Sequence, residues 1–220
     1  MQSTIPSGAQ ASLQPTSNLD KRALRKRLRR ERLLLTRQQR DYASYQAMRN
    51  LLPLAQYFSH HVTDKADIRV GVFIDAFGEL PTQPLIDWAY RQGFSVYLPV
   101  VSAADKALNF AKLQHANVRQ ARLVRHRLGM HQPAYGETLR VQALDMLFMP
   151  LVAFDRHGHR MGMGGGFYDR TLAKVKGKPL KIGWAYDFQC VEQLDAHPWD
   201  VNLDMAVTPS RLWRFKRYVR

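Results

Sequence analysis

Short apolar runs rich in β-branched residues recur along the chain and predict strands that are buried on both faces. These runs cover residues 68–75, 94–101, 108–113, 144–150, 180–186 and 204–208. Stretches with the apolar spacing or composition of helices lie before and between them. They cover residues 21–35, 37–58 with a bend at Pro53, 83–92 with Gly93 as the stop signal, and 167–176. Residues 118–139 have mixed polarity and predict no regular element.

Strands that alternate with helices in this way are typical of a parallel sheet with covered faces. The sequence therefore predicts an α/β fold, Rossmann-like, in which one mainly parallel sheet is flanked by helices on both faces. A chain of 220 residues suits a single compact domain. Residues 1–18, rich in Ser, Gln, Thr and Pro, predict a flexible tail and leave residues 19–215 as the domain. Asp20 is the predicted N-cap of the first helix.

Composition narrows the class of protein only in part. No apolar run approaches the roughly 20 residues of a membrane span, and the N-terminal stretch lacks the pattern of a secretory signal. The single cysteine, Cys190, has no second cysteine for a disulfide within the chain, which favours the cytoplasm. The net charge of +15 indicates a polyanionic partner. Nucleic acid, a small phosphorylated ligand in a basic pocket, or a merely solvated basic face would each fit that charge.

The most informative segment is RMGMGGGFYDR, residues 160–170, between a predicted strand and a predicted helix. Its four glycines allow positive φ angles and let the backbone come close to a ligand. Consecutive N–H groups with the positive end of a helix behind them are suited to a phosphate group. The segment lacks the Gly-Lys-Ser/Thr ending of a P-loop, and Phe167 stands where the dinucleotide-binding pattern needs a glycine. A mobile surface turn is the plainer interpretation of the same glycines.

The same segment, with the preceding LDMLFMPLVAFDRHGH, closely resembles the signature loop of the 5-formyltetrahydrofolate cyclo-ligase family. Three other segments resemble motifs of that family in the same order along the chain. They are KRALR at residues 21–25, ELPT at residues 79–82 after IRVGVFID, and HPWDVNLDMAVT at residues 197–208. GMHQP at residues 129–133 is a looser match. The resemblance covers residues 20–210, and the glycine-rich loop is its specific part.

Resemblance to this family implies an enzyme that converts 5-formyltetrahydrofolate into 5,10-methenyltetrahydrofolate, with ATP as cosubstrate and Mg²⁺ as cofactor. The formyl group is an amide, so its carbon is a poor electrophile. In the family's mechanism, the formyl oxygen attacks the γ-phosphate and ADP is released. N10 then adds to the imidate-like phosphate ester, and phosphate leaves. The protein's tasks are mostly positioning and charge neutralisation.

The resemblance also implies roles for individual residues. Those implied in ATP binding are Lys21, Arg22, Ala23, Leu24, Arg25, Arg160, Met161, Gly162, Met163, Gly164, Gly165, Gly166, Phe167 and Tyr168. Those implied in folate binding are Ile74, Glu79, Met163, Gly164, Gly165, Gly166 and Phe167, and the implied Mg²⁺ ligands are Asp169 and Asp200. The residues implied to be catalytic are Lys21, Arg25, Glu79 and Tyr168. Among them, the two cations would contact phosphates and Glu79 would accept hydrogen bonds from the pterin.

Each assignment has a plainer alternative. Most cations of a basic helix are simply solvated. Asp169 fits an acid in the first turn of a helix, and Asp200 fits a turn residue. Ile74 fits core packing, and Glu79 fits an exposed loop acid. His157 and His159 suggest a metal site with Asp155, but an H-x-H pair on a polar turn more often faces solvent.

Other functions compete with a cyclo-ligase. The basic helix from Lys21 to Arg32 would suit a protein that binds nucleic acid, with binding that weakens steeply as salt rises. An enzyme for sugar phosphates or coenzyme A would also fit an α/β fold with a glycine-rich loop. A repurposed member of the family that keeps only nucleotide binding is a further alternative. The sequence leaves the oligomeric state open, with a monomer favoured.

Overall fold

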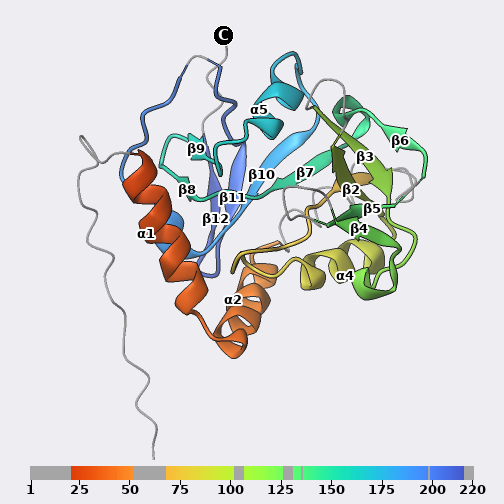
Figure 1. Ribbon diagram of the computed structural model, residues 1–220, viewed down its shortest axis with the longest axis horizontal. Helices are drawn as coiled ribbons and strands as arrows, with labels where there is room; N and C mark the ends of the chain where they lie inside the picture. The colour runs from red at the N-terminus through yellow and green to blue at the C-terminus, as the bar shows by residue number, and fades with distance from the viewer. Residues whose placement is uncertain are drawn as a thin grey trace, which may run out of the picture.

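The computed structural model describes residues 21–51, 68–101, 107–125, 131–134, 136–197 and 199–215, which form one α/β domain around a central sheet (Figure 1). The predicted tail at residues 1–18, the N-cap at Asp20 and the bend at Pro53 lie outside the described residues. In the part of the chain that the structure describes, no helix is long and apolar enough to cross a membrane.

The central sheet has eight strands in the order β12-β11-β10-β7-β1-β2-β3-β6. They are β1 (Arg69–Gly71), β2 (Ser95–Val101), β3 (Leu108–Lys112), β6 (Thr138–Leu139), β7 (Met146–Met149), β10 (Leu180–Trp184), β11 (Met205–Val207) and β12 (Leu212–Arg214). The strands from β11 to β2 run parallel, whereas β12, β3 and β6 join antiparallel at the two edges. The predicted mainly parallel sheet is therefore confirmed.

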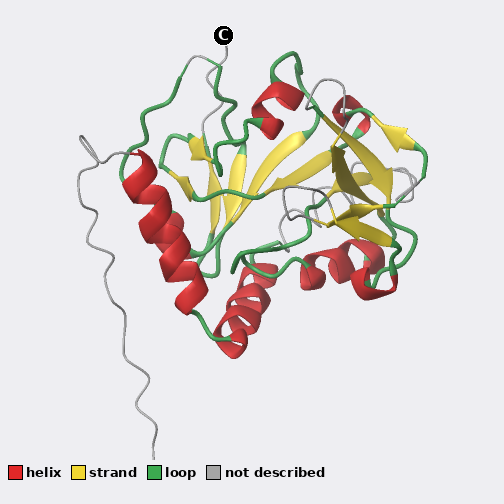
Figure 2. Ribbon diagram, in the orientation of Figure 1, coloured by secondary structure: helices red, strands yellow, loops and turns green. Residues whose placement is uncertain are grey.

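Helices lie on both sides of this sheet (Figure 2). The α-helices are α1 (Lys21–Leu34), α2 (Arg37–Arg49), α4 (Gln83–Arg91) and α5 (Phe167–Leu172), and the 3₁₀ turns are η2 (Val118–Gln120), η3 (Val141–Ala143) and η4 (Asp187–Gln189). Strand β7 shows why both faces must be covered, because its four side chains are all buried. Met146 and Phe148 pack into the core with α2 and α4, and Leu147 and Met149 pack into the core with α5.

The strand order places a topological switch point between β1 and β7. The connection from β1 through α4 leads to β2 on one side, and the connection from β7 through α5 leads to β10 on the other. Open parallel sheets bind ligands in the crevice beyond the carboxyl ends of their strands at such a point. The segments that leave β1 and β7, at residues 72–79 and 150–152, begin at this crevice.

Helix α1 does not lie over the main sheet but against a hairpin of β8 (Ala153–Phe154) and β9 (Arg160–Met161). Leu24 and Leu28 are buried in a small apolar cluster with Met161 of this hairpin. Strands of two residues carry no periodicity, so the sequence did not predict the hairpin. A second unpredicted ladder, β4 (Leu123–Arg125) with β5 (His131–Pro133), lies in the segment of mixed polarity.

Three predicted elements end well before their predicted bounds. The helix predicted over residues 37–58 ends at Arg49, with Asn50 as its C-cap. The strand predicted over residues 68–75 pairs only over β1, and the remainder leaves the sheet to form the wall of a cavity. The helix predicted over residues 167–176 ends at Leu172, after which a turn from the Val175 amide to the Leu172 carbonyl lets both side chains pack against the same core. An α5 of six residues gives a weaker dipole than the longer helix predicted.

Candidate active site

A cavity of about 460 Å³ lies at the switch point of the sheet. Its wall brings together the glycine-rich loop, the start of α1, the segment after β1, the end of β2, and the segment before β11. The predicted site residues that line it are Lys21, Arg25, Ile74, Glu79, Arg160, Met161, Gly162, Met163, Gly164, Gly165, Gly166, Phe167, Tyr168, Asp169 and Asp200. The predicted site residues come from four segments far apart in the sequence, and these segments meet at one cavity.

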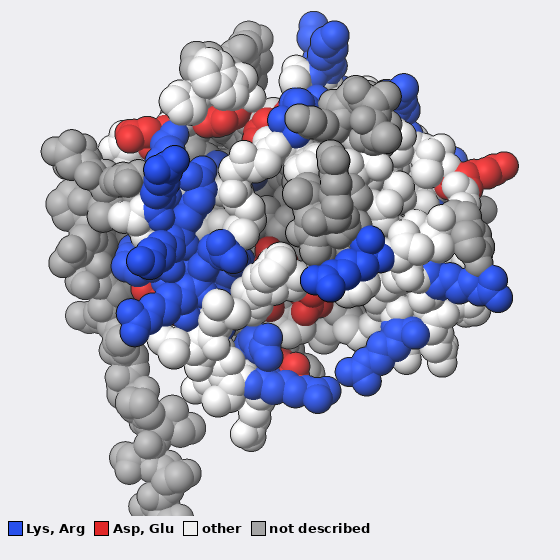
Figure 3. Space-filling view, viewed as in Figure 1, with Lys and Arg blue, Asp and Glu red and all other residues white. Residues whose placement is uncertain are grey.

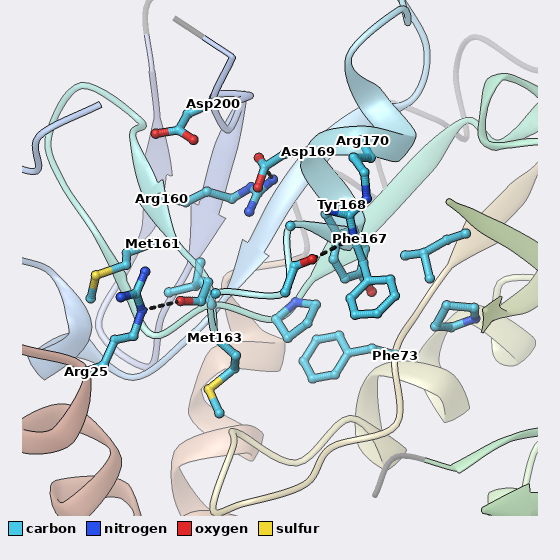
Figure 4. Close-up of a pocket in the computed structure, with 18 of the residues that line it drawn as sticks. Arg25, Phe73, Arg160, Met161, Met163, Phe167, Tyr168, Asp169, Arg170 and Asp200 are labelled. Carbon is cyan, nitrogen blue, oxygen red and sulfur yellow. Dashed lines mark hydrogen bonds and ion pairs between the residues drawn. The ribbon is translucent and has the colours of Figure 1, made fainter. Parts of the chain in front are cut away.

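The glycine-rich loop connects β9 to α5 along the edge of the cavity. Gly164 has a φ of 100°, and a Cβ built there would meet no heavy atom within 4 Å, so its backbone faces open space. Gly165, in contrast, packs closely against the Phe167 ring, because a Cβ built there would lie 2.8 Å from that ring. Arg170 donates to the Gly165 carbonyl at 2.6 Å, and its guanidinium lies over the Phe167 ring (Figure 4). These contacts fix the loop, while its backbone at Gly164 stays open to a ligand.

Helix α1 supplies cations to this loop. Arg25 Nε donates to the Gly162 carbonyl oxygen at 2.9 Å, which ties α1 to the loop (Figure 4). Lys21 Nζ lies 3.1 Å from His197 Nε2, and the His197 ring stacks on the exposed Trp199 ring with centroids 4.8 Å apart. One end of the cavity therefore has donors, cations and an exposed aromatic face.

The three residues between these cations do not line the cavity. Leu24 is buried against the β8–β9 hairpin, and Arg22 and Ala23 are exposed. Their ATP contacts remain predictions. Figure 3 shows Lys and Arg side chains gathered over α1, so this helix presents most of its charge to solvent.

Two acidic side chains line the same end of the cavity. Asp169 Oδ1 accepts from Arg160 Nη2 at 2.6 Å and from the Val201 amide at 3.4 Å. Asp200 Oδ2 accepts from the His197 amide at 2.8 Å and closes a turn. The plainer interpretations therefore describe real features: Asp169 lies in the first turn of α5, and Asp200 holds a turn. Neither feature uses all the oxygen lone pairs, which leaves both carboxylates able to accept a further ligand.

Glu79 lies in a tightly bonded loop that also lines the cavity. Its Oε2 accepts from the Ala76 amide at 3.0 Å, and its Oε1 lies 3.6 Å from Arg32 Nη1. The loop is closed by Asp75, whose Oδ1 accepts from both the amide and the hydroxyl of Thr82 at 2.9 Å. The side chain of Glu79 is only 11% exposed, so it is not an ordinary exposed loop acid.

The electrostatics of the Glu79 carboxyl follow from this enclosure. Burial raises the pKa of Glu79 to about 7, and the nearby Asp75 carboxylate adds to that rise. The Ala76 amide and the Arg32 guanidinium oppose the rise because both stabilise the carboxylate. Burial, and then the charge on Glu79, also raise the pKa of the Tyr168 phenol, which therefore stays protonated. The carboxyl group consequently titrates near neutral pH inside the cavity.

Aromatic and apolar side chains line the half of the cavity next to Tyr168, whose phenol interacts electrostatically with Glu79. Phe73 is buried, and Phe167 comes from the glycine-rich loop (Figure 4). Phe77, which is 44% exposed with a φ of 52°, also lines the cavity. Ile74 also lines this half, although it contacts the core as well. The other apolar members are Pro99, Val101 and Leu108. These surfaces suit a flat ring system with polar groups at one edge.

Several residues that line the cavity were not predicted from the sequence. They are Phe73, Phe77, His131, Gln132, His159, His197 and Trp199. His131 and Gln132 come from the loosely matched segment at residues 129–133, which was the one available signal for them. Gln132 Oε1 accepts from the Val101 amide at 3.2 Å and so joins β5 to β2 beside the cavity.

The prediction that the H-x-H pair faces solvent is wrong for His159. Its Nδ1 lies 2.8 Å from Oδ2 of Asp155, a fully buried carboxylate that also accepts from the His157, His159 and Leu194 amides. The bonds of Asp155 to these backbone amides close the β8–β9 turn. His157 itself is exposed. The sequence showed the three residues together but not that Asp155 would be buried beneath them.

A mainly parallel sheet with a phosphate-suited loop at its switch point defines an α/β enzyme. Residues 17–209 match the 5-formyltetrahydrofolate cyclo-ligase family. The chain is 39% identical over 191 residues to 5-formyltetrahydrofolate cyclo-ligase of Escherichia coli strain K12, covering 86% of this chain and 100% of that protein. It is 34% identical to the Haemophilus influenzae enzyme of the same name, covering 82% and 92% of the two chains. The chain belongs to the 5-formyltetrahydrofolate cyclo-ligase family.

Solved structures agree with this membership. The NMR structure of 5,10-methenyltetrahydrofolate synthetase from Aquifex aeolicus superposes with a TM-score of 0.71 at 29% identity, covering 91% of this chain and 94% of that one. The enzyme of the same name from Mycoplasma pneumoniae gives a TM-score of 0.63 at 24% identity, covering 87% and 99%. The second comparison supports the fold alone, whereas the family and its ligase class rest on the other matches.

Proposed function

We propose that this chain converts 5-formyltetrahydrofolate into 5,10-methenyltetrahydrofolate with ATP as the phosphoryl donor. The observation that carries the proposal is the division of a single cavity into two chemically distinct halves. The half next to α1 has cations and carboxylates, and the half next to Tyr168, whose phenol interacts with Glu79, has aromatic rings (Figure 4). Membership of the cyclo-ligase family supports these two substrates together.

The polar half suits the triphosphate. The backbone of Gly164 borders open space, and Lys21, Arg25 and Arg160 bring positive charge to the same cavity. Such donors neutralise the charge that develops on the transferred phosphoryl group and so stabilise the transition state of phosphoryl transfer. The short α5 contributes little, so the amides and these side chains bear most of this task.

The apolar half suits the pterin. Phe73, Phe77 and Phe167 offer ring faces, and the Glu79 carboxylate is placed to accept hydrogen bonds from the donor edge of the ring. With the folate held there, its formyl oxygen would face the γ-phosphate. The formyl oxygen attacks phosphorus and ADP leaves. N10 then adds to the activated carbon and gives up its proton, and the phosphate departs with the oxygen that was in the formyl group.

The donor set fits a Mg²⁺ ion that is held together with phosphates. In the described residues, no group of three or more His, Cys, Asp or Glu gathers to form an all-protein metal site. Mg²⁺ commonly uses one or two carboxylates, with waters and phosphate oxygens filling its other positions. Asp169 and Asp200 line the polar half and would hold it there. When bound, the ion would neutralise charge on the β- and γ-phosphates.

Turnover with oxygen-labelled substrate tests this proposal. The protein is incubated with ATP, Mg²⁺ and 5-formyltetrahydrofolate carrying ¹⁸O in the formyl group, and methenyltetrahydrofolate absorbance, ADP and phosphate are measured. One ADP should appear per methenyltetrahydrofolate, and the ¹⁸O should appear in the inorganic phosphate. Folded protein that gives no product would overturn the proposed function. Product with unlabelled phosphate would overturn only the phosphorylated intermediate.

The basic surface of α1 would also suit nucleic acid as a second ligand. Lys26 and Arg30 are exposed on this helix, away from the cavity lining. Binding through them would weaken steeply with salt, and Lys26→Ala with Arg30→Ala would reduce it. The same double variant should leave cyclisation unchanged, so the two activities are separable.

A further inference from the structure

A buried arginine on α1 contacts the glutamate of the pterin half. Arg32 is 1% exposed, and its Nη1 lies 3.6 Å from Glu79 Oε1 and 3.4 Å from the Leu151 carbonyl oxygen. Arg32 itself does not line the cavity, whereas Glu79 does. The guanidinium therefore acts on the cavity only through the carboxylate in front of it.

Part of the hydrogen-bonding capacity of the Arg32 guanidinium is not used by the described residues. Its Nε and Nη2 are buried and have no hydrogen-bond partner among the described residues. Burial accordingly lowers the pKa of Arg32, and the charge on Glu79 opposes that change. An apolar side chain of similar size at this position is often as good for stability as a buried ion pair. The placement is therefore better explained by its effect on Glu79 than by packing.

The Glu79 loop is pressed against the same point of α1. Gly78 has a φ of 74°, and a Cβ built there would lie 2.9 Å from the Arg32 carbonyl oxygen. The Glu79 carboxylate is gripped at both oxygens, by the Ala76 amide at Oε2 and by Arg32 at Oε1. Each oxygen keeps a further acceptor position for a ligand in the cavity.

Arg32 and Arg25 lie seven residues apart, which is about two turns, and so share one face of α1. Arg25 bonds the glycine-rich loop, and Arg32 bonds the Glu79 loop. Helix α1 thus sets the spacing between the two halves of the cavity. Leu24 and Leu28 lie on the same side and anchor the helix in its apolar cluster.

We propose that Arg32 is a positioning residue that holds the Glu79 carboxylate ionised and aimed into the pterin half of the cavity. The proposal rests on the proposed function, because it takes Glu79 as the acceptor for the pterin. Arg32 touches no substrate and acts through Glu79. Its removal should therefore weaken folate binding and leave the triphosphate contacts in place.

Several other charged groups face this pair. Asp75 lies in the same loop as Glu79, Tyr168 approaches from α5, and Tyr186 from the segment after β10. Arg29 acts on Arg32 from its own helix. The pKa of Glu79 is already raised to about 7 by burial, and the Arg32 guanidinium opposes that rise. Without Arg32 the pKa of Glu79 should rise further, so the carboxylate would form only at higher pH.

Arg32→Met and Arg32→Lys test this role in the full chain. The carboxyl group of Glu79 is titrated by ¹³C NMR, with Glu79→Gln to assign its signal, and this readout needs no substrate. In parallel, KM is measured separately for 5-formyltetrahydrofolate and for ATP across the neutral pH range. Arg32→Met should raise the pKa of Glu79 and raise the folate KM about tenfold or more, with the ATP KM changed less than about twofold.

Arg32→Lys keeps the charge and should restore most of both properties, which a purely structural role would not predict from a shorter, differently shaped cation. If Arg32→Met does not fold, Arg32→Lys still tests the proposal. A lysine variant in which only one of the two properties changes, the folate KM or the pKa of Glu79, contradicts the proposal. Folded Arg32→Met with an unchanged Glu79 titration overturns it. If the wild type fails to turn over, the proposed function fails while the titration still reports on Arg32.

Discussion

Arg25 Nε and the carbonyl oxygen of Gly162 lie 2.9 Å apart although 137 positions separate the two residues in the chain. The bond joins the first helix to the glycine-rich loop at the edge of the cavity. Because the bond uses Nε and the guanidinium makes no other hydrogen bond among the described residues, its two terminal nitrogens can face an anion. Arg25 would therefore both shape the loop and supply charge to the triphosphate.

Arg25→Ala removes both contributions at once. The KM for ATP should rise about tenfold or more, because a charge-assisted contact and the support of the loop are lost together. Steady-state kinetics with varied ATP would measure this. Lys26→Ala is the matched control, since Lys26 is exposed one position further along α1 and does not line the cavity. Equal ATP KM values for the two variants would show that Arg25 does not serve the nucleotide.

Gly164→Ala separates backbone strain from ligand approach. A side chain at a φ of 100° costs on the order of 1 kcal/mol in the folded state, and the added methyl group would occupy the open space that phosphate is predicted to use. Gly136→Ala is a control with similar strain, because Gly136 has a φ of 134° and also nothing within 4 Å of its Cβ position. Calorimetric titration with ATP should show weaker binding only for Gly164→Ala. Parallel losses in both variants would mean that strain alone explains the effect.

Asp169→Asn and Asp200→Asn test the metal assignment. Each replaces an anionic oxygen by a neutral one of the same shape, so the Mg²⁺ concentration for half-maximal rate should rise about tenfold. Asp41→Asn is the control, because Asp41 forms an exposed pair with Arg37 outside the cavity. A titration of rate against Mg²⁺ that is unchanged in Asp169→Asn would assign this carboxylate to its Arg160 ion pair alone.

Folate affinity should depend on pH through Glu79. The pKa of this carboxyl is raised to about 7, so the carboxylate that accepts hydrogen bonds forms as the pH rises through that value. At saturating ATP, the KM for 5-formyltetrahydrofolate should therefore fall between about pH 6 and pH 8. Glu79→Gln should have a high KM without that dependence. A wild-type KM that rises over this range would contradict the assignment of Glu79 as an acceptor.

The sequence predicted those parts of the molecule whose signals are local. Strands such as β7 and β10 are apolar runs bounded by residues that break regular structure. The glycines within residues 162–166 indicate a loop whose backbone can come close to a ligand. The alternation of strands and helices along the chain then predicted the mainly parallel sheet. The glycine-rich loop, Glu79 and the first cations could be named because each lies within a short motif.

Contacts between distant segments could not be predicted in the same way. The pairing of Arg32 with Glu79 depends on how α1 lies against the loop after β1, and neither residue carries a local signal for it. Phe77 looked like an ordinary loop residue, yet its backbone conformation turns it toward the cavity. The two-residue strands β8 and β9 exist because α1 packs on their hairpin, which is a tertiary cause without any periodicity.

A co-crystal structure with a non-hydrolysable ATP analogue, Mg²⁺ and 5-formyltetrahydrofolate tests the division of the cavity most directly. The triphosphate should lie within hydrogen-bonding distance of the amides of residues 162–166 and of Lys21 or Arg25, with the pterin against Phe73 and its donor edge at Glu79. A triphosphate bound away from the glycine-rich loop, or a pterin far from Glu79, would contradict the proposed mechanism.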